Sequence, residues 1–176
     1  MFAECSSLTF TPELPATTLA NSCYNSMFAG CTSLKSASEL PAKTLAAKCY
    51  DGMFSGCTSL ISAPKLPATT LAEGCYWYMF SNCSSLISAP KLPATELTER
   101  CYDSMFSGCT SLKSAFELPA TTFADDCYYA MFSYTKITEL HYPKSIENDS
   151  TFKDMHESPY FGTKAKNTTV YVYYDL

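Results

Sequence analysis

The sequence has few basic residues, and they form no run. Its 12 lysine and arginine residues stand against 17 aspartate and glutamate residues, which gives a net charge of -5. Nucleic-acid binding takes much of its affinity from basic side chains that displace counterions, so a nucleic-acid partner is not expected. The sequence also lacks an apolar run long enough to cross a membrane, and no basic segment followed by an apolar one opens the chain. We therefore expect neither membrane insertion nor a signal peptide.

Histidine is nearly absent, since His141 and His156 are the only two. No C-x-x-C motif occurs, and neither histidine falls among the cysteine positions, so a zinc site is not indicated. Catalysis needs a constellation of unlike residues, whereas this chain supplies copies of like ones. We expect no enzymatic activity, and hence no catalytic residues, no metal and no cofactor.

What the chain does contain is repetition. A Met-Phe pair recurs at a constant interval, beginning at Met1, Met27, Met53, Met79, Met105 and Met131. A fixed step of about 20 to 50 residues is typical of solenoids, in which each repeat buries its core against its neighbours. We interpret residues 1–130 as five repeats and 131–176 as a degenerate last repeat and C-terminal cap. Within that cap, 137–143 is expected to be a shortened coil and 170–174 a closing strand.

One half of each repeat is expected to be extended. In the stretch 60–67 the sequence places Leu, Ala and Leu at spacings of three, which favours a segment with one side inward. Pro64 and Pro90 cannot donate to a strand ladder, so a long regular strand is excluded. The sequence predicts a short or irregular strand.

The other half is expected to be helical. Thr70 and Glu73 fit a capping box, and Leu71, Cys75 and Met79 then follow at i, i+4 and i+8, which is the apolar stripe of a three-turn helix. Glycine or asparagine follows four of the six Met-Phe pairs, at Gly30, Gly56, Asn82 and Gly108, and indicates a helix stop. The predicted fold is therefore an α/β repeat solenoid: a right-handed leucine-rich-repeat-like coil of short strands and short helices with a 26-residue period.

The ten cysteines fall into two columns at the repeat period. An even count suggests disulfides, but Cys49 and Cys57 would lie about 12 Å apart along one helix, too far to pair. Metal binding is the second alternative, and the spacing does not favour it. The favoured interpretation is that cysteine serves as a small buried hydrophobe where coils pack closely.

Candidate binding residues are those that vary between repeats while the core is repeated. On the strand side they make a small apolar and basic patch, and two ring-bearing residues add a candidate contact site on the helical side. An exposed face with no ligand is the alternative. The candidates are Lys35, Ile61, Lys65, Ile87, Lys91, Lys113, Phe116, Trp77 and Tyr78.

The start of the chain falls inside a repeat. Because Met1 already occupies the Met column, we interpret the chain as a piece of a longer protein. Nothing resembling a cap precedes the first coil, and terminal repeats normally carry one. We therefore expect this end to fray or to associate with another copy of the chain.

The pattern F-x-x-C-x-x-L followed by Leu-Pro, as in 54–60 and then 66–67, resembles the BspA-like leucine-rich-repeat surface proteins of bacteria. The resemblance covers all five repeats, although the repeat unit here is longer than the family's common form. It implies a secreted or cell-surface protein whose repeat face binds proteins, sometimes as an adhesin. The function expected is a non-enzymatic module that binds a protein or a glycan. The alternative is a structural spacer or stalk segment of a larger surface protein.

Overall fold

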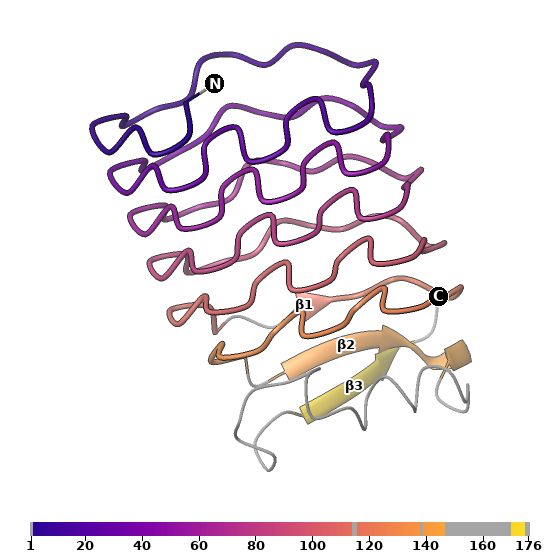
Figure 1. Cartoon of the computed structure of the whole chain (residues 1–176). Helices are drawn as coiled ribbons and strands as arrows, with labels where there is room; N and C mark the ends of the chain where they lie inside the picture. Colours follow the sequence, from indigo (N-terminus) through magenta and orange to yellow (C-terminus); the bar gives the residue numbers. More distant parts are fainter. Residues whose placement is uncertain (1, 114–115, 138, 147–169, 175–176) are drawn as a thin grey trace.

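The computed structural model describes residues 2–113, 116–137, 139–146 and 170–174, and it shows a stack of similar coils (Figure 1). Isolated parallel bridges join residues of successive coils, such as Phe10 with Ser36 and Ser62 with Ser88, and each bridge spans 26 positions. The repeat solenoid and its period are therefore as predicted.

A small parallel sheet follows the stack of coils. Its strands are β1 (Phe116–Glu117), β2 (Glu139–Pro143) and β3 (Val170–Tyr174), in the order β1-β2-β3, and a 3-10 helix, η1 (Lys144–Ile146), follows β2. Phe116 pairs with Leu140, 24 positions further on, so the last coil is shorter than the others, as expected. The predicted closing strand is β3, which pairs with β2 along its whole length.

Each coil has a straighter run and an undulating run, both visible in Figure 1. The straighter run carries the predicted strand, and it is as irregular as Pro64 suggested, with isolated bridges in place of a continuous ladder. Single backbone bonds hold these runs together, from Ile61 N to Lys35 O and from Ile87 N to Ile61 O. Lys35, Ile61 and Ile87 therefore stack in one column.

The undulating run replaces the predicted helix, and here the sequence-based prediction is wrong. No α-helix occurs in the described residues. Thr70, expected as a helix cap, instead forms a bridge with Thr44. The residues from 46 to 57 form overlapping four-residue turns, and we call this stretch and its equivalents in other coils the turn run.

Backbone hydrogen bonds in the turn run alternate between two directions. N–H groups at 49, 51, 53, 55 and 57 donate three residues back within the same coil. Those at 48, 50, 52, 54 and 56 donate to carbonyls of the next coil, as the N–H of Tyr50 does to the carbonyl of Cys75. Half of the bonds thus close turns and half join coils, so almost every peptide group is satisfied without a helix.

The turns need a left-handed backbone at every fourth residue. In the second coil these positions are Lys48, Gly52 and Gly56, with φ values of 55°, 59° and 73°. Two glycines four residues apart would cost a helix about 1 kcal/mol each, but they suit this backbone. The glycine predicted to stop a helix does adopt the left-handed conformation, although it closes a turn.

The core consists of columns of identical residues stacked along the solenoid. Phenylalanine rings from Phe2 to Phe132 stack at centroid separations of 5.6–6.0 Å, and a second stack runs from Tyr24 to Tyr128 at 5.7–5.8 Å. Aromatic pairs at these separations add to the free energy gained by burial. Leu60, like its counterparts in the middle coils, is fully buried.

Substituting Ser22 with glycine tests the turn run directly. Ser22 is exposed and has a φ of 56°. Relief of left-handed strain should raise the free energy of unfolding by up to about 1 kcal/mol, measured by urea denaturation. The matched control is Ser55→Gly, at a turn-run position without positive φ, which should lower it by roughly 0.5–1 kcal/mol. If both substitutions lowered the free energy of unfolding, the turn run would be a helix instead.

Candidate binding surfaces

The straighter runs present the predicted strand-side patch. Ile61 and Ile87 are 49% and 54% exposed, which is unusual for two large aliphatic side chains in one column. Lys35 lies directly next to them in the column, and Lys113 is also exposed. Phe116 lies in β1, but its side chain is outside the described part of the structure. The structure therefore brings Ile61 and Ile87 together as predicted.

A second strand-side column carries charges of both signs. The ammonium group of Lys65 lies 2.8 Å from a carboxylate oxygen of Glu39, and this contact raises the pKa of Lys65. Lys91, one coil further on, is exposed and has no carboxylate within ion-pair distance in the described residues. Glu117 follows in β1. Within the described part of the chain, Lys91 is thus a free cation between an ion pair and an acid.

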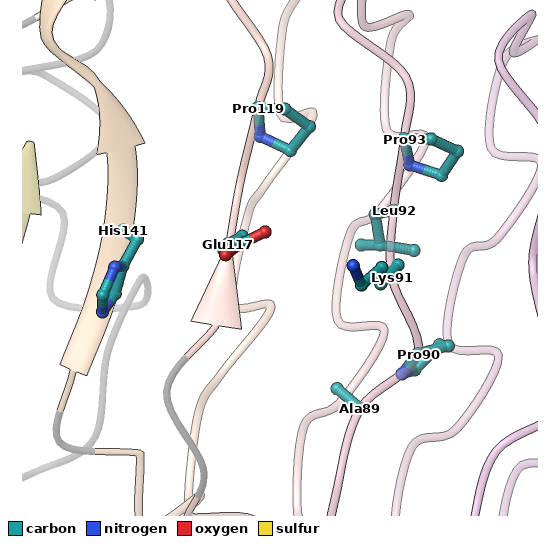
Figure 2. Close-up of a pocket in the computed structure, with 8 residues that line it drawn as sticks. All are labelled: Ala89, Pro90, Lys91, Leu92, Pro93, Glu117, Pro119 and His141. Carbon is teal, nitrogen blue, oxygen red and sulfur yellow. The ribbon is translucent and has the colours of Figure 1, made fainter. Parts of the chain in front are cut away.

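Open depressions lie beside this charged column. One, of about 370 Å³, is lined by 89–93 on one coil together with Glu117, Pro119 and His141 on later ones (Figure 2). The other, of about 430 Å³, is lined by 63–67 and by residues of the 90–93 stretch. These depressions were not predicted from the repeat pattern. The sequence feature that could have indicated them is the tetrapeptide Pro-Lys-Leu-Pro, which occurs only at 64–67 and 90–93.

The predicted ring pair on the other side lies in the turn run. Trp77 and Tyr78 stack on each other at 5.3 Å, and the ammonium group of Lys48 lies 5.9 Å from the centre of the Trp77 ring. Tyr78 is 42% exposed, whereas Trp77 is half-buried. This pair is separate from the strand-side patch along the coil, so the chain offers two candidate surfaces.

A buried carboxylate next to this pair was not anticipated. Asp103, in the coil after Trp77, is only 6% exposed, and its carboxylate accepts a hydrogen bond of 2.7 Å from the Ser104 hydroxyl. Burial raises the pKa of Asp103, and the Ser104 hydrogen bond opposes that rise. The same column holds Asp51, where the amide of Asn25 donates at 2.8 Å. Each of these carboxylates is held by a hydrogen bond from a neighbouring residue or a neighbouring coil, so we assign both a structural role.

None of the ten cysteines, all of which lie in the described residues, forms a disulfide, and the favoured interpretation as small buried side chains is confirmed for eight of them. All are buried except Cys5, which is half-buried, and Cys23, which is exposed. The Cys57 thiol donates to the carbonyl of Phe28 at 3.1 Å, and Cys83 repeats this contact one coil further on. Burial raises the pKa of Cys57 to about 12. These thiols are structural donors with little nucleophilic character at neutral pH.

The residues described here offer little for catalysis or metal binding. Nowhere among them do three His, Cys, Asp or Glu side chains gather as a metal site requires. The imidazole of His141 contacts the carboxylate of Glu139, and His156 lies outside the described residues. None of the helical segments in the described ranges has the length and apolar character needed to cross a membrane.

These features define a repeat solenoid of the leucine-rich class, with an invariant core and a variable exposed face. A family model described as a BspA type leucine-rich repeat region matches the chain in six copies, over residues 1–86 and 21–157. The chain therefore belongs to the BspA-type leucine-rich-repeat family, and this membership indicates a surface repeat protein of a typically non-enzymatic kind. No curated protein matches the chain, and no solved structure does.

Proposed function

We propose that this chain is a non-enzymatic binding module of a secreted or cell-surface protein, and that it recognises a protein or glycan through its strand-side face. The observation that carries the proposal is the exposed column of Ile61 and Ile87, which lies on the same straighter runs as the residues that line the open depressions. Single exposed aliphatic side chains are common, but neighbouring ones that form a contiguous apolar patch mark interaction sites. An adhesin-like role follows if the partner lies on another cell or on a matrix.

A binding screen tests the proposal. The purified chain is presented with extracellular-matrix proteins, mucins and surface glycans, and a saturable hit is expected. Replacing Ile61 and Ile87 together with serine should weaken that hit at least tenfold, because their apolar area would no longer be buried. Tyr78→Ser, an exposed ring in the turn run, is the matched control and should leave binding unchanged. Loss with Tyr78→Ser alone would move the site to the turn run.

A structural spacer is the second candidate, favoured by the unbroken stacks of phenylalanine and tyrosine. Such stacks tie each coil to the next and give a stiff rod, which is what a stalk needs. A spacer requires no recognition face. A negative screen with a correctly folded chain would therefore favour the spacer.

A further inference from the structure

The two strand-side depressions form one groove. Pro90, Lys91 and Pro93 line both of them, so the depressions meet at this coil. The groove, here called the proline groove, starts at 63–67, crosses 89–93 and ends at Glu117, Pro119 and His141. Figure 2 shows the last three of these residues on the two coils that follow Lys91. The groove thus runs across the coils, along the axis of the solenoid.

The length of the proline groove suits a short extended chain. It crosses four successive coils, and parallel runs lie about 4.8 Å apart, so it is roughly 14 Å long. An extended peptide rises about 3.3 Å per residue, and about four residues would fill the groove. Both depressions are open, so a ligand can lie in them from the side.

The walls of the proline groove are apolar and rigid. Pro64, Pro67, Pro90 and Pro93 supply rings, and Leu92 closes the floor as a buried side chain. Proline has no backbone N–H, so these four positions of the wall cannot donate to the backbone of a ligand strand. We therefore expect apolar contact and the few charged groups to carry most of the recognition.

The charged residues of the proline groove determine which ligand charge it can bind. Lys65 already pairs with Glu39, whereas Lys91, which lines both depressions, lacks a partner in the described residues. Glu117 at the far end repels a second carboxylate. The groove is complementary to one negative charge over Lys91 between apolar groups, and a uniformly acidic polymer would fit it poorly.

We propose that the proline groove binds an extended peptide segment of a partner protein, with one carboxylate side chain placed over Lys91 and apolar side chains on both sides of it. The proposal rests on the proposed function and names its ligand class. A peptide is favoured over a glycan because none of the lining residues is Phe, Tyr or Trp, the side chains that stack on sugar rings.

The test uses the whole chain and defined peptides. The probe is a set of amidated, acetylated hexapeptide mixtures in which one central position is fixed as Glu, Gln or Lys and the others are apolar or proline. Binding is measured at low ionic strength, where an exposed ion pair is least screened. The Glu mixture should bind roughly tenfold more tightly than the Gln mixture, about 1.4 kcal/mol.

Matched variants locate the charge. Lys91→Gln should abolish the preference for Glu over Gln, while Lys43→Gln, at an exposed lysine that lines neither depression, should keep it. An equal preference in the parent chain and in Lys91→Gln would overturn the proposal. So would binding of polyglutamate or heparin in place of the Glu mixture, because a general anion site would then explain the result.

The outcomes also separate this proposal from the proposed function. If no peptide mixture binds but the screen gives a hit that depends on Ile61 and Ile87, the module stands and the peptide groove is wrong. A hit with an acidic glycan that Lys91→Gln abolishes would assign the groove to a glycan and refute the peptide. Failure of both the screen and the mixtures would refute both.

Discussion

Raising the pH is expected to unfold the chain cooperatively between about pH 10 and 11. Burial raises the pKa of the buried thiols well above the ordinary value of 9.0, so these groups stay protonated in the folded chain and ionise in the unfolded one. Values reach about 11 for Cys49 and Cys127 and about 12 for Cys57, Cys75 and Cys109.

The sign and size of the change in stability with pH follow from proton linkage. Above pH 9 the folded chain holds more protons than the unfolded chain, so the free energy of unfolding falls as the pH rises. Below pH 9 this stabilisation is fully present. Each thiol removes about 1.4 kcal/mol per pH unit, and the five together remove on the order of 7 kcal/mol at pH 10. Domains are typically stable by about 5–15 kcal/mol, so the loss is decisive.

Two absorbance signals check this result. Thiolate and tyrosinate absorbance should rise together with loss of near-ultraviolet circular dichroism, because burial also raises the pKa of Tyr76 and Tyr102 well above 10. Cys57→Ala should flatten the dependence of stability on pH by about 1.4 kcal/mol per unit, whereas Cys23→Ala, at an exposed site, should not. Gradual ionisation with native dichroism retained to pH 12 would contradict the expectation.

Replacing Leu86 with aspartate should unfold the middle of the solenoid. Leu86 is fully inaccessible to solvent, between the equally buried Leu60 and Leu112. An unpaired carboxylate there is expected to cost about 4 kcal/mol or more. Since each coil is stabilised by its neighbours, the damage should spread to both adjacent coils. Hydrogen exchange of the backbone amides measures how far it spreads.

Two variants of the same kind provide the comparison. Ile87→Asp introduces the same charge one residue away at an exposed site, and should change stability by less than about 1 kcal/mol. Leu8→Asp, in the half-buried leucine of the first coil, should cost less than Leu86→Asp. Equal losses at Leu8 and Leu86 would indicate a single globular core and contradict the nearest-neighbour stack.

The sequence predicted the features that depend on periodicity alone. The 26-residue step, the buried leucine and cysteine columns and the irregular strand at Pro64 are all confirmed. The helix was wrong because apolar residues at i, i+4 and i+8 fit two backbones, one with 3.6 residues per turn and one with four. Gly52 and Gly56 held the distinguishing information, since a helix disfavours both and a left-handed turn position favours them.

The candidate site also has some features that could be predicted from the sequence and others that could not. Exposure of Ile61, Ile87 and Tyr78 could be predicted, because residues that vary against a repeated core lie outside it. The proline groove could not, since it depends on how 63–67, 89–93 and Glu117 meet across coils. Pairing of Lys65 with Glu39 is likewise a contact between coils, and only the structure shows which of the two groove lysines makes it.

The alternating backbone bonds fix which N–H groups of a turn run donate within the coil and which donate to the next coil. Loss of one residue from a turn run would exchange the two sets of N–H groups in the remainder of that run. Removing a block of four would keep both the alternation and the left-handed positions in place. The last coil is shorter outside its turn run, because the phenylalanine stack keeps the 26-residue step to Phe132 whereas Phe116 and Leu140 pair across 24 positions. A change of coil length outside the turn run therefore leaves the alternating bonds of the turn run intact.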